Sequence, residues 1–98
     1  MPIGIIGTGD YARALAKRLA RCDYKVLCGS RFPHTRVLAQ RDPELATLDV
    51  SVVAIAQAID DAEVVFLAVH PEHAEAVLRN HATSLKGKVG LITRFFKL

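Results

Sequence analysis

Near its N-terminus the chain reads Ile3-Gly4-Ile5-Ile6-Gly7-Thr8-Gly9-Asp10-Tyr11-Ala12. The first part is a short apolar run, which predicts a buried strand over residues 3–6. The second part fits the pattern G-x-G-x-x-A, in which glycines permit a tight turn and let a ligand approach the backbone closely. Apolar residues at helical spacing follow and predict a helix over residues 10–22. A strand, a glycine turn and an amphipathic helix in this order predict a turn whose backbone amides face an anion.

A second apolar run, residues 24–28, predicts another strand and is followed by Gly29-Ser30-Arg31. About 20 residues beyond such a glycine turn, dinucleotide-binding folds that prefer NAD carry Asp or Glu, which accepts hydrogen bonds from the ribose. Here Ser30 and Arg31 stand in that place. A hydroxyl and a guanidinium both suit a 2′-phosphate, and Arg36 is positioned to add a third contact. The pattern therefore predicts NADPH binding; a glycine turn without a ligand and an ordinary surface arginine are the alternatives.

The rest of the chain alternates between apolar runs and helical patterns. We expect strands over residues 48–53, 64–69 and 89–93, and helices over residues 34–41, 54–61 and 72–80. This alternation predicts an α/β fold of Rossmann type, a doubly wound parallel sheet of five strands in the order 3-2-1-4-5. Ligand would lie across the carboxyl ends of the first and fourth strands. That crevice would bring together the cofactor-binding candidates, which are Gly7, Thr8, Gly9, Asp10, Tyr11, Ala12, Ser30, Arg31, Arg36, Val69 and His70.

Composition narrows the function classes. The chain has 98 residues, of which 51% are hydrophobic, enough for one packed domain over residues 1–98. Since no apolar run reaches about 18 residues, we expect no membrane span. A net charge of +3 without interleaved aromatic residues gives little support for a nucleic-acid partner. The fourfold spacing of Arg13, Lys17 and Arg21 predicts a solvated helix face, and Cys22 and Cys28 are expected to be free thiols.

The segment His70-Pro71-Glu72-His73 admits three interpretations. Two histidines and a carboxylate suit a metal ion, but further ligands at metal-site spacing are missing, so we expect no metal site. The position after the fourth strand instead suits the wall of a nicotinamide pocket, and a segment without a functional role is the third interpretation. No nucleophile with a base and an orienting group is evident, so we assign no catalytic residue.

Four blocks of sequence carry a resemblance to a known family: Gly7-Thr8-Gly9-Asp10-Tyr11-Ala12-Arg13-Ala14-Leu15, Arg21-Cys22-Asp23-Tyr24, Gly29-Ser30-Arg31-Phe32-Pro33 and Leu67-Ala68-Val69-His70-Pro71-Glu72-His73. In order and spacing they resemble the N-terminal cytosolic oxidoreductase domain of the STEAP metalloreductases. The resemblance runs from Ile3 to about Ile92. A more distant resemblance is to the prokaryotic deazaflavin-dependent NADP oxidoreductases, which have similar G-T-G-D and G-S-R blocks.

The resemblance implies a role in metal reduction. STEAP proteins pass a hydride from cytosolic NADPH to a flavin, and electrons then reach ferric or cupric ions through a haem-containing membrane domain in endosomes or at the plasma membrane. By this resemblance, residues 7–11 match the phosphate-binding loop of the family. Ser30 and Arg31 match the residues that bind the 2′-phosphate, and Val69 and His70 match the segment beside the nicotinamide. FAD would be shared with a membrane domain that this chain lacks, so the domain over residues 1–98 is expected to be incomplete at its C-terminus.

Two function classes remain open at this point, beside a soluble reductase that acts on free flavin or deazaflavin and a truncated sheet that does not fold stably. The first is an NADPH-dependent oxidoreductase domain that donates hydride to flavin for the reduction of iron or copper. The second is a non-catalytic NADPH-binding module, or truncated isoform, that forms oligomers with full-length relatives. Turnover with a flavin and a ferric chelate would favour the first, and binding without turnover would favour the second.

Overall fold

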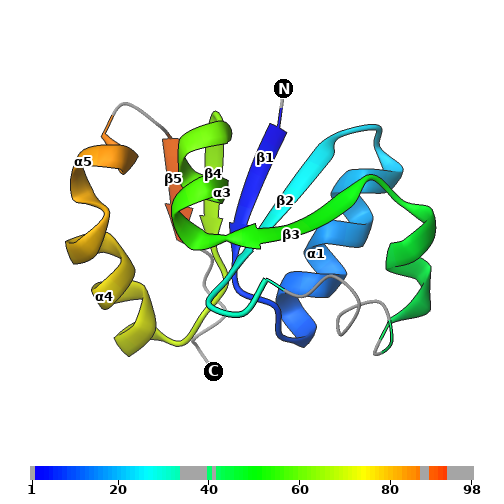
Figure 1. Cartoon of the computed structure of the whole chain (residues 1–98), viewed down its shortest axis with the longest axis horizontal. Helices are drawn as coiled ribbons and strands as arrows, with labels where there is room; N and C mark the ends of the chain where they lie inside the picture. The colour runs from blue at the N-terminus through cyan, green and yellow to red at the C-terminus, as the bar shows by residue number, and fades with distance from the viewer. Residues whose placement is uncertain (1, 34–39, 41, 87–88, 93–98) are drawn as a thin grey trace.

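A parallel β-sheet organises the chain in the computed structural model, which describes residues 2–33, 40, 42–86 and 89–92 (Figure 1). Its strands are β1 (Pro2–Ile6), β2 (Lys25–Ser30), β3 (Val50–Ala54), β4 (Val64–Leu67) and β5 (Val89–Ile92). They lie in the order β3-β2-β1-β4-β5. β1 is therefore central, and Ile5 aligns with Cys28 of β2 on one side and with Phe66 of β4 on the other. The predicted order 3-2-1-4 of the first four strands is confirmed.

Helices cover both faces of the sheet (Figure 1). They are α1 (Asp10–Arg21), the 3₁₀ helix η1 (Pro43–Thr47), α3 (Ile55–Asp61), α4 (Pro71–Asn80) and α5 (Ala82–Leu85). Because successive strand residues face opposite sides, Ile5 packs in a core with α1 and η1, whereas Ile6 packs in a second core with α3 and α4. The chain thus forms a three-layer α/β fold of the doubly wound type.

Several element bounds differ from the sequence-based expectations. β2 runs on to Ser30, two residues beyond the predicted end, because Gly29 and Ser30 still pair with β3. The structure also contains two short helices that were not predicted, η1 (Pro43–Thr47) and α5 (Ala82–Leu85). The predicted helix over residues 34–41, including Arg36, falls almost entirely outside the described residues.

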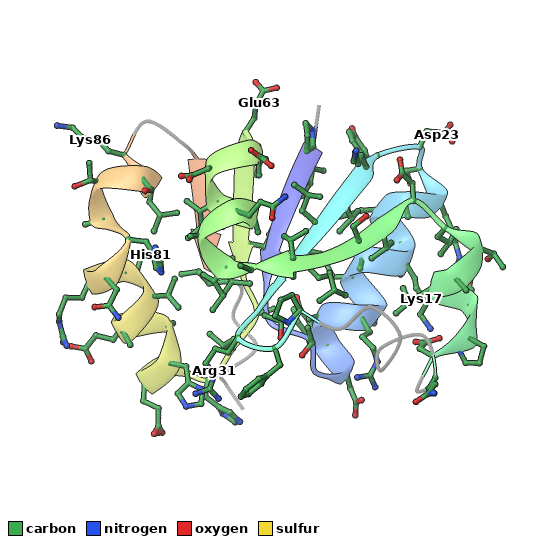
Figure 2. The ribbon with its side chains drawn as sticks, in the orientation of Figure 1. Lys17, Asp23, Arg31, Glu63, His81 and Lys86 are labelled. Atoms are coloured by element: carbon green, nitrogen blue, oxygen red, sulfur yellow. The ribbon has the colours of Figure 1, made fainter. Side chains whose placement is uncertain are left out.

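The face of α1 that carries Arg13, Lys17 and Arg21 was predicted to be solvated, but it packs against acidic residues. Lys17 Nζ lies 2.9 Å from Asp42 Oδ2, and Arg21 Nε donates a hydrogen bond of 2.9 Å to Glu44 Oε2. Figure 2 shows Lys17 on the side of α1 that faces η1. The prediction of a solvated face was wrong because helical spacing identifies a face but not what packs against it. Acidic residues more than 20 positions away along the chain meet these cations.

Among the described residues, no helix combines the length and apolar character required to cross a lipid bilayer.

Candidate dinucleotide-binding site

A cleft of about 560 Å³ opens at the carboxyl edge of the sheet. Its walls come from the end of β1 and the turn after it, the end of β2 and the two residues after it, the start of α3, the segment after β4, and α4 with the residue that follows it. The lining residues are Ile6, Gly7, Thr8, Gly29, Ser30, Arg31, Phe32, Ile55, Val69, His73, Ala76, Val77, Asn80 and His81. The winding of the sheet reverses between β1 and β4, and doubly wound folds bind ligands in the crevice at that place.

Gly7 is required by the local backbone. Its φ is +131°, a conformation that L side chains rarely adopt, and a Cβ there would lie 2.5 Å from the carbonyl oxygen of Ala68. The Gly7 N–H donates to the Gly29 carbonyl oxygen at 3.0 Å, so the turn is fixed against β2. Gly9 differs, since a Cβ at this position would meet nothing within 4 Å. At Gly7 the turn therefore packs directly against the sheet, whereas at Gly9 there is free space beside the backbone. A phosphate that binds to the backbone amides needs such space.

The remaining residues of the glycine turn have distinct places. Thr8 lines the cleft, whereas Asp10 and Tyr11 stand in the first turn of α1 with exposed side chains. The Asp10 carboxylate forms an ion pair with Arg13. Ala12 is fully buried in the core against β1 and β2, so its small side chain lets α1 pack close to the sheet. Of this motif, only Gly7 and Thr8 line the cleft; Gly9, Asp10, Tyr11 and Ala12 do not.

Ser30 and Arg31 also line the cleft. The Phe32 N–H donates a hydrogen bond of 3.0 Å to Ser30 Oγ, which forms a tight turn directly after β2. The Arg31 guanidinium carbon stands 6.0 Å from the centroid of the Phe32 ring, within cation–π range. Figure 2 shows Arg31 at the carboxyl edge of the sheet. No residue that lines the described cleft is acidic, so an anion would meet one cation and no like charge.

The segment between β4 and α4 contributes one residue to the cleft. Val69 lines it, but His70 does not; His73, one turn into α4, does. The two imidazole rings are 6.2 Å apart and nearly perpendicular. Within residues 2–33, 40, 42–86 and 89–92, no group of three or more His, Cys, Asp or Glu side chains is placed to hold a metal ion.

Several residues that line the cleft were not predicted from the sequence. Phe32, Ile55, Ala76, Asn80 and His81 were not predicted as site residues, and His73 was considered only as a metal ligand or as part of a nicotinamide wall. Figure 2 shows His81 between the end of α4 and the start of α5. The spacing of residues 73, 76, 77 and 80 on one helix face was a usable signal, but only the packing of α4 shows that this face lines the cleft.

Comparison with known proteins identifies relatives that are oxidoreductases. The metalloreductase STEAP3 of Rattus norvegicus is 39% identical over 87 residues, which is 89% of this chain and 16% of that protein. The metalloreductase STEAP2 of Homo sapiens is 37% identical over 71 residues, 72% of this chain and 13% of that protein. The chain therefore spans about a sixth or less of the length of these relatives. The predicted resemblance to the STEAP metalloreductases is confirmed.

Solved structures give the same result for the fold. A putative F420-dependent NADP-reductase from an Arthrobacter species has a TM-score of 0.79 at 28% identity, covering 92% of this chain and 43% of that one. An imine reductase from Streptomyces aurantiacus has a TM-score of 0.73 at 22% identity, over 94% of this chain and 31% of that one. The second likeness shows the fold alone.

The model of one protein family, described as coenzyme F420-dependent NADP oxidoreductase, matches residues 2–92. The match includes the glycine turn, Ser30, Arg31 and the whole described cleft. The chain therefore belongs to the coenzyme F420-dependent NADP oxidoreductase family, as a domain related to the STEAP metalloreductases.

Proposed function

We propose that this domain binds NADPH in the cleft and orients it for hydride transfer to a flavin-type acceptor. The observation that carries the proposal is that one cleft joins the glycine turn at Gly7 and Thr8 to the pair Ser30 and Arg31. The first end suits a pyrophosphate and the second suits a 2′-phosphate. An NADP dinucleotide carries both groups on one adenosine, so both ends of the cleft would be used together.

The preference for NADPH over NADH follows from the end of β2. A carboxylate at the position of Ser30 would accept hydrogen bonds from the ribose hydroxyls of NAD and would repel a 2′-phosphate. In this chain the hydroxyl of Ser30 and the exposed guanidinium of Arg31 stand there instead. Arg36 remains a proposed third contact. Arginine is suited to phosphate because its planar guanidinium donates two parallel hydrogen bonds.

The other contacts are assigned along the cleft. The amides of residues 8–12 would face the pyrophosphate, with the positive end of α1 behind them. Val77 and Asn80 of α4 line the same cleft as Arg31 and are proposed to contact the adenine. Val69 and His70, in the segment between β4 and α4, are proposed to contact the nicotinamide half.

The chemistry that bound NADPH supplies is hydride donation. The residues of the chain do not need to act as acid or base for that step; they bind the phosphates, orient the nicotinamide and exclude water. The family description supports a deazaflavin or flavin acceptor, and the similarity to metalloreductases supports onward reduction of iron or copper with FAD bound in part by a further domain. On the same similarity we propose that the domain faces the cytosol beneath an endosomal or plasma membrane and forms oligomers with full-length relatives.

Calorimetric titration with NADPH and NADH tests the binding proposal, with Arg31→Ala as the variant. We expect NADPH to bind at least about tenfold more tightly than NADH, and the variant to lose that difference while keeping its NADH affinity. Equal affinity for the two dinucleotides in the unmodified chain would contradict the assignment of Ser30 and Arg31. Oxidation of bound NADPH by a flavin and a ferric chelate then tests catalysis, and tight binding without turnover would instead support a binding module.

A further inference from the structure

Arg13 is the most enclosed cation of α1, and its role is not explained by the solvated face that its spacing predicted. Its side chain is only 11% exposed. One guanidinium nitrogen, Nη1, donates a hydrogen bond of 2.9 Å to the carbonyl oxygen of Thr8. The other, Nη2, pairs with the Asp10 carboxylate. The third, Nε, lies 3.8 Å from Asp42 Oδ2 and has no hydrogen-bond partner within the described part of the chain.

The bond to Thr8 determines how the next amide is oriented. The peptide between Thr8 and Gly9 is trans, as all described peptides are. In a planar trans peptide the C=O and the N–H point in opposite directions. Since the Thr8 carbonyl is held toward the Arg13 guanidinium, the Gly9 N–H must point away from it.

The second half of the turn is held by the backbone of residue 13 and not by its side chain. The Arg13 N–H donates to the Gly9 carbonyl oxygen at 2.9 Å and so closes the first turn of α1. Arg13 thus bonds to two successive carbonyls, those of Thr8 and Gly9. Around Gly9 itself a Cβ would meet open space. On that side no neighbouring atom contacts the turn, and the guanidinium holds the Thr8–Gly9 peptide from the side of the Thr8 carbonyl.

We infer that Arg13 is a positioning residue for dinucleotide binding: it holds the Thr8–Gly9 peptide so that the Gly9 N–H is presented to the pyrophosphate before ligand arrives. This inference rests on the proposed function. A binding amide that is already oriented avoids the entropy cost of ordering the turn on association. Arg13 acts from behind the turn through the carbonyl, whereas Arg31 would touch the ligand itself.

Lys17 provides a matched control for this role. It lies one turn further along the same face of α1 and pairs with the same Asp42, at 2.9 Å. Its described ion pairs are to Asp42 and Glu44, and none reaches the glycine turn. Replacing Lys17 by Met removes a cation and an ion pair to η1 without touching the Thr8 carbonyl.

The test compares Arg13→Met, Arg13→Lys and Lys17→Met by calorimetry with NADPH and with NADH. Both dinucleotides contain the pyrophosphate, so Arg13→Met should weaken both by the same factor, about tenfold, and leave their affinity ratio unchanged. Arg13→Lys keeps a charged donor for the Thr8 carbonyl and should recover part of that loss. Lys17→Met should change either affinity by less than about twofold.

A second readout needs no ligand. In the free protein, ¹⁵N relaxation of the Gly9 amide should show a rigid N–H in the unmodified chain and in Lys17→Met, and a mobile one in Arg13→Met. An Arg13→Met variant that keeps a rigid Gly9 amide, or that loses no more affinity than Lys17→Met, would overturn the inference. If the unmodified chain binds neither dinucleotide, the proposed function fails, while the relaxation comparison still decides whether Arg13 positions the peptide.

Discussion

The backbone N–H of Phe32 donates a 3.0 Å hydrogen bond to Ser30 Oγ at the point where β2 ends. A hydroxyl that accepts through one lone pair still has its own proton to donate. The Ser30 side chain accepts the hydrogen bond of the turn that carries Arg31 and Phe32, and on the proposed function its O–H would donate to the 2′-phosphate. Comparing the affinities for NADPH and NADH can separate these two roles, because only NADPH carries a 2′-phosphate.

Ser30→Ala removes both the acceptor for the Phe32 amide and the donor to a 2′-phosphate. We expect NADPH affinity to fall by about tenfold while NADH affinity changes much less, because only NADPH carries that phosphate. Ser30→Thr keeps the hydroxyl and should retain most of the affinity. Calorimetric titration measures all three proteins, and an equal loss of affinity for NADPH and NADH in Ser30→Ala would argue that Ser30 serves the turn alone.

Gly7→Ala and Gly9→Ala should affect different properties. At Gly7 a methyl group would meet the Ala68 carbonyl oxygen at 2.5 Å on a backbone with φ of +131°. We expect the free energy of unfolding to fall by about 2–4 kcal/mol. At Gly9 the space is open, so the loss should be less than about 1 kcal/mol. Denaturant unfolding measures both values.

Gly9→Ala should nevertheless weaken dinucleotide binding, because the added methyl group occupies space through which a pyrophosphate would approach the backbone. A Gly9→Ala protein with unchanged stability and unchanged affinity for NADPH would show that the phosphates do not approach the turn at Gly9.

The ion pair between Lys17 and Asp42 should contribute to stability only modestly. Both side chains are partly buried, and Nζ lies 2.9 Å from Oδ2. A double-mutant cycle with Lys17→Met and Asp42→Asn should give a coupling free energy of about 0.5–1 kcal/mol, decreasing as salt is added. A coupling near zero at low salt would mean that η1 is held to α1 by the packing of Leu45 instead.

The two cysteines should differ in reactivity. Cys22 is exposed at the end of α1, whereas Cys28 is buried in β2, where burial raises the pKa of its thiol from 9.0 to about 11. A thiol-specific reagent should label one thiol quickly in the native protein, and Cys22→Ser should remove that fast phase. Rapid labelling of two thiols in the folded protein would contradict the burial of Cys28.

The raised pKa of Cys28 also predicts a loss of stability in alkali. As pH rises through 9.0, the thiol of the unfolded chain loses its proton first, while the folded protein keeps its proton up to about 11. The unfolded state then binds fewer protons, so the free energy of unfolding falls across that interval. Cys28→Val lacks this titration and should show a shallower fall, which unfolding curves on both sides of pH 9 would measure.

The local sequence was sufficient to identify the glycine turn and its surroundings. Gly7 and Gly9 come directly after an apolar strand, and the backbone conformation at Gly7 is one that few residues other than glycine adopt. The sequence predicted the end of β2 two residues too early, but it singled out Ser30 and Arg31, which stand where an acidic residue would indicate NAD. The order of the first four strands followed from the right-handed connection rule, which depends on chain direction and not on particular side chains.

The sequence by itself therefore determined the strand–turn–helix unit and the order of β1 to β4, since both arise from short-range sterics and a general rule of handedness. Only the tertiary structure decided which side chains meet from distant elements. It brought Asp42 and Glu44 against α1, put His73 rather than His70 in the wall of the cleft, and enclosed Arg13 behind the glycine turn. Spacing along a helix specifies which residues share a face, but the partner of that face is set by packing between elements that the sequence pattern does not relate.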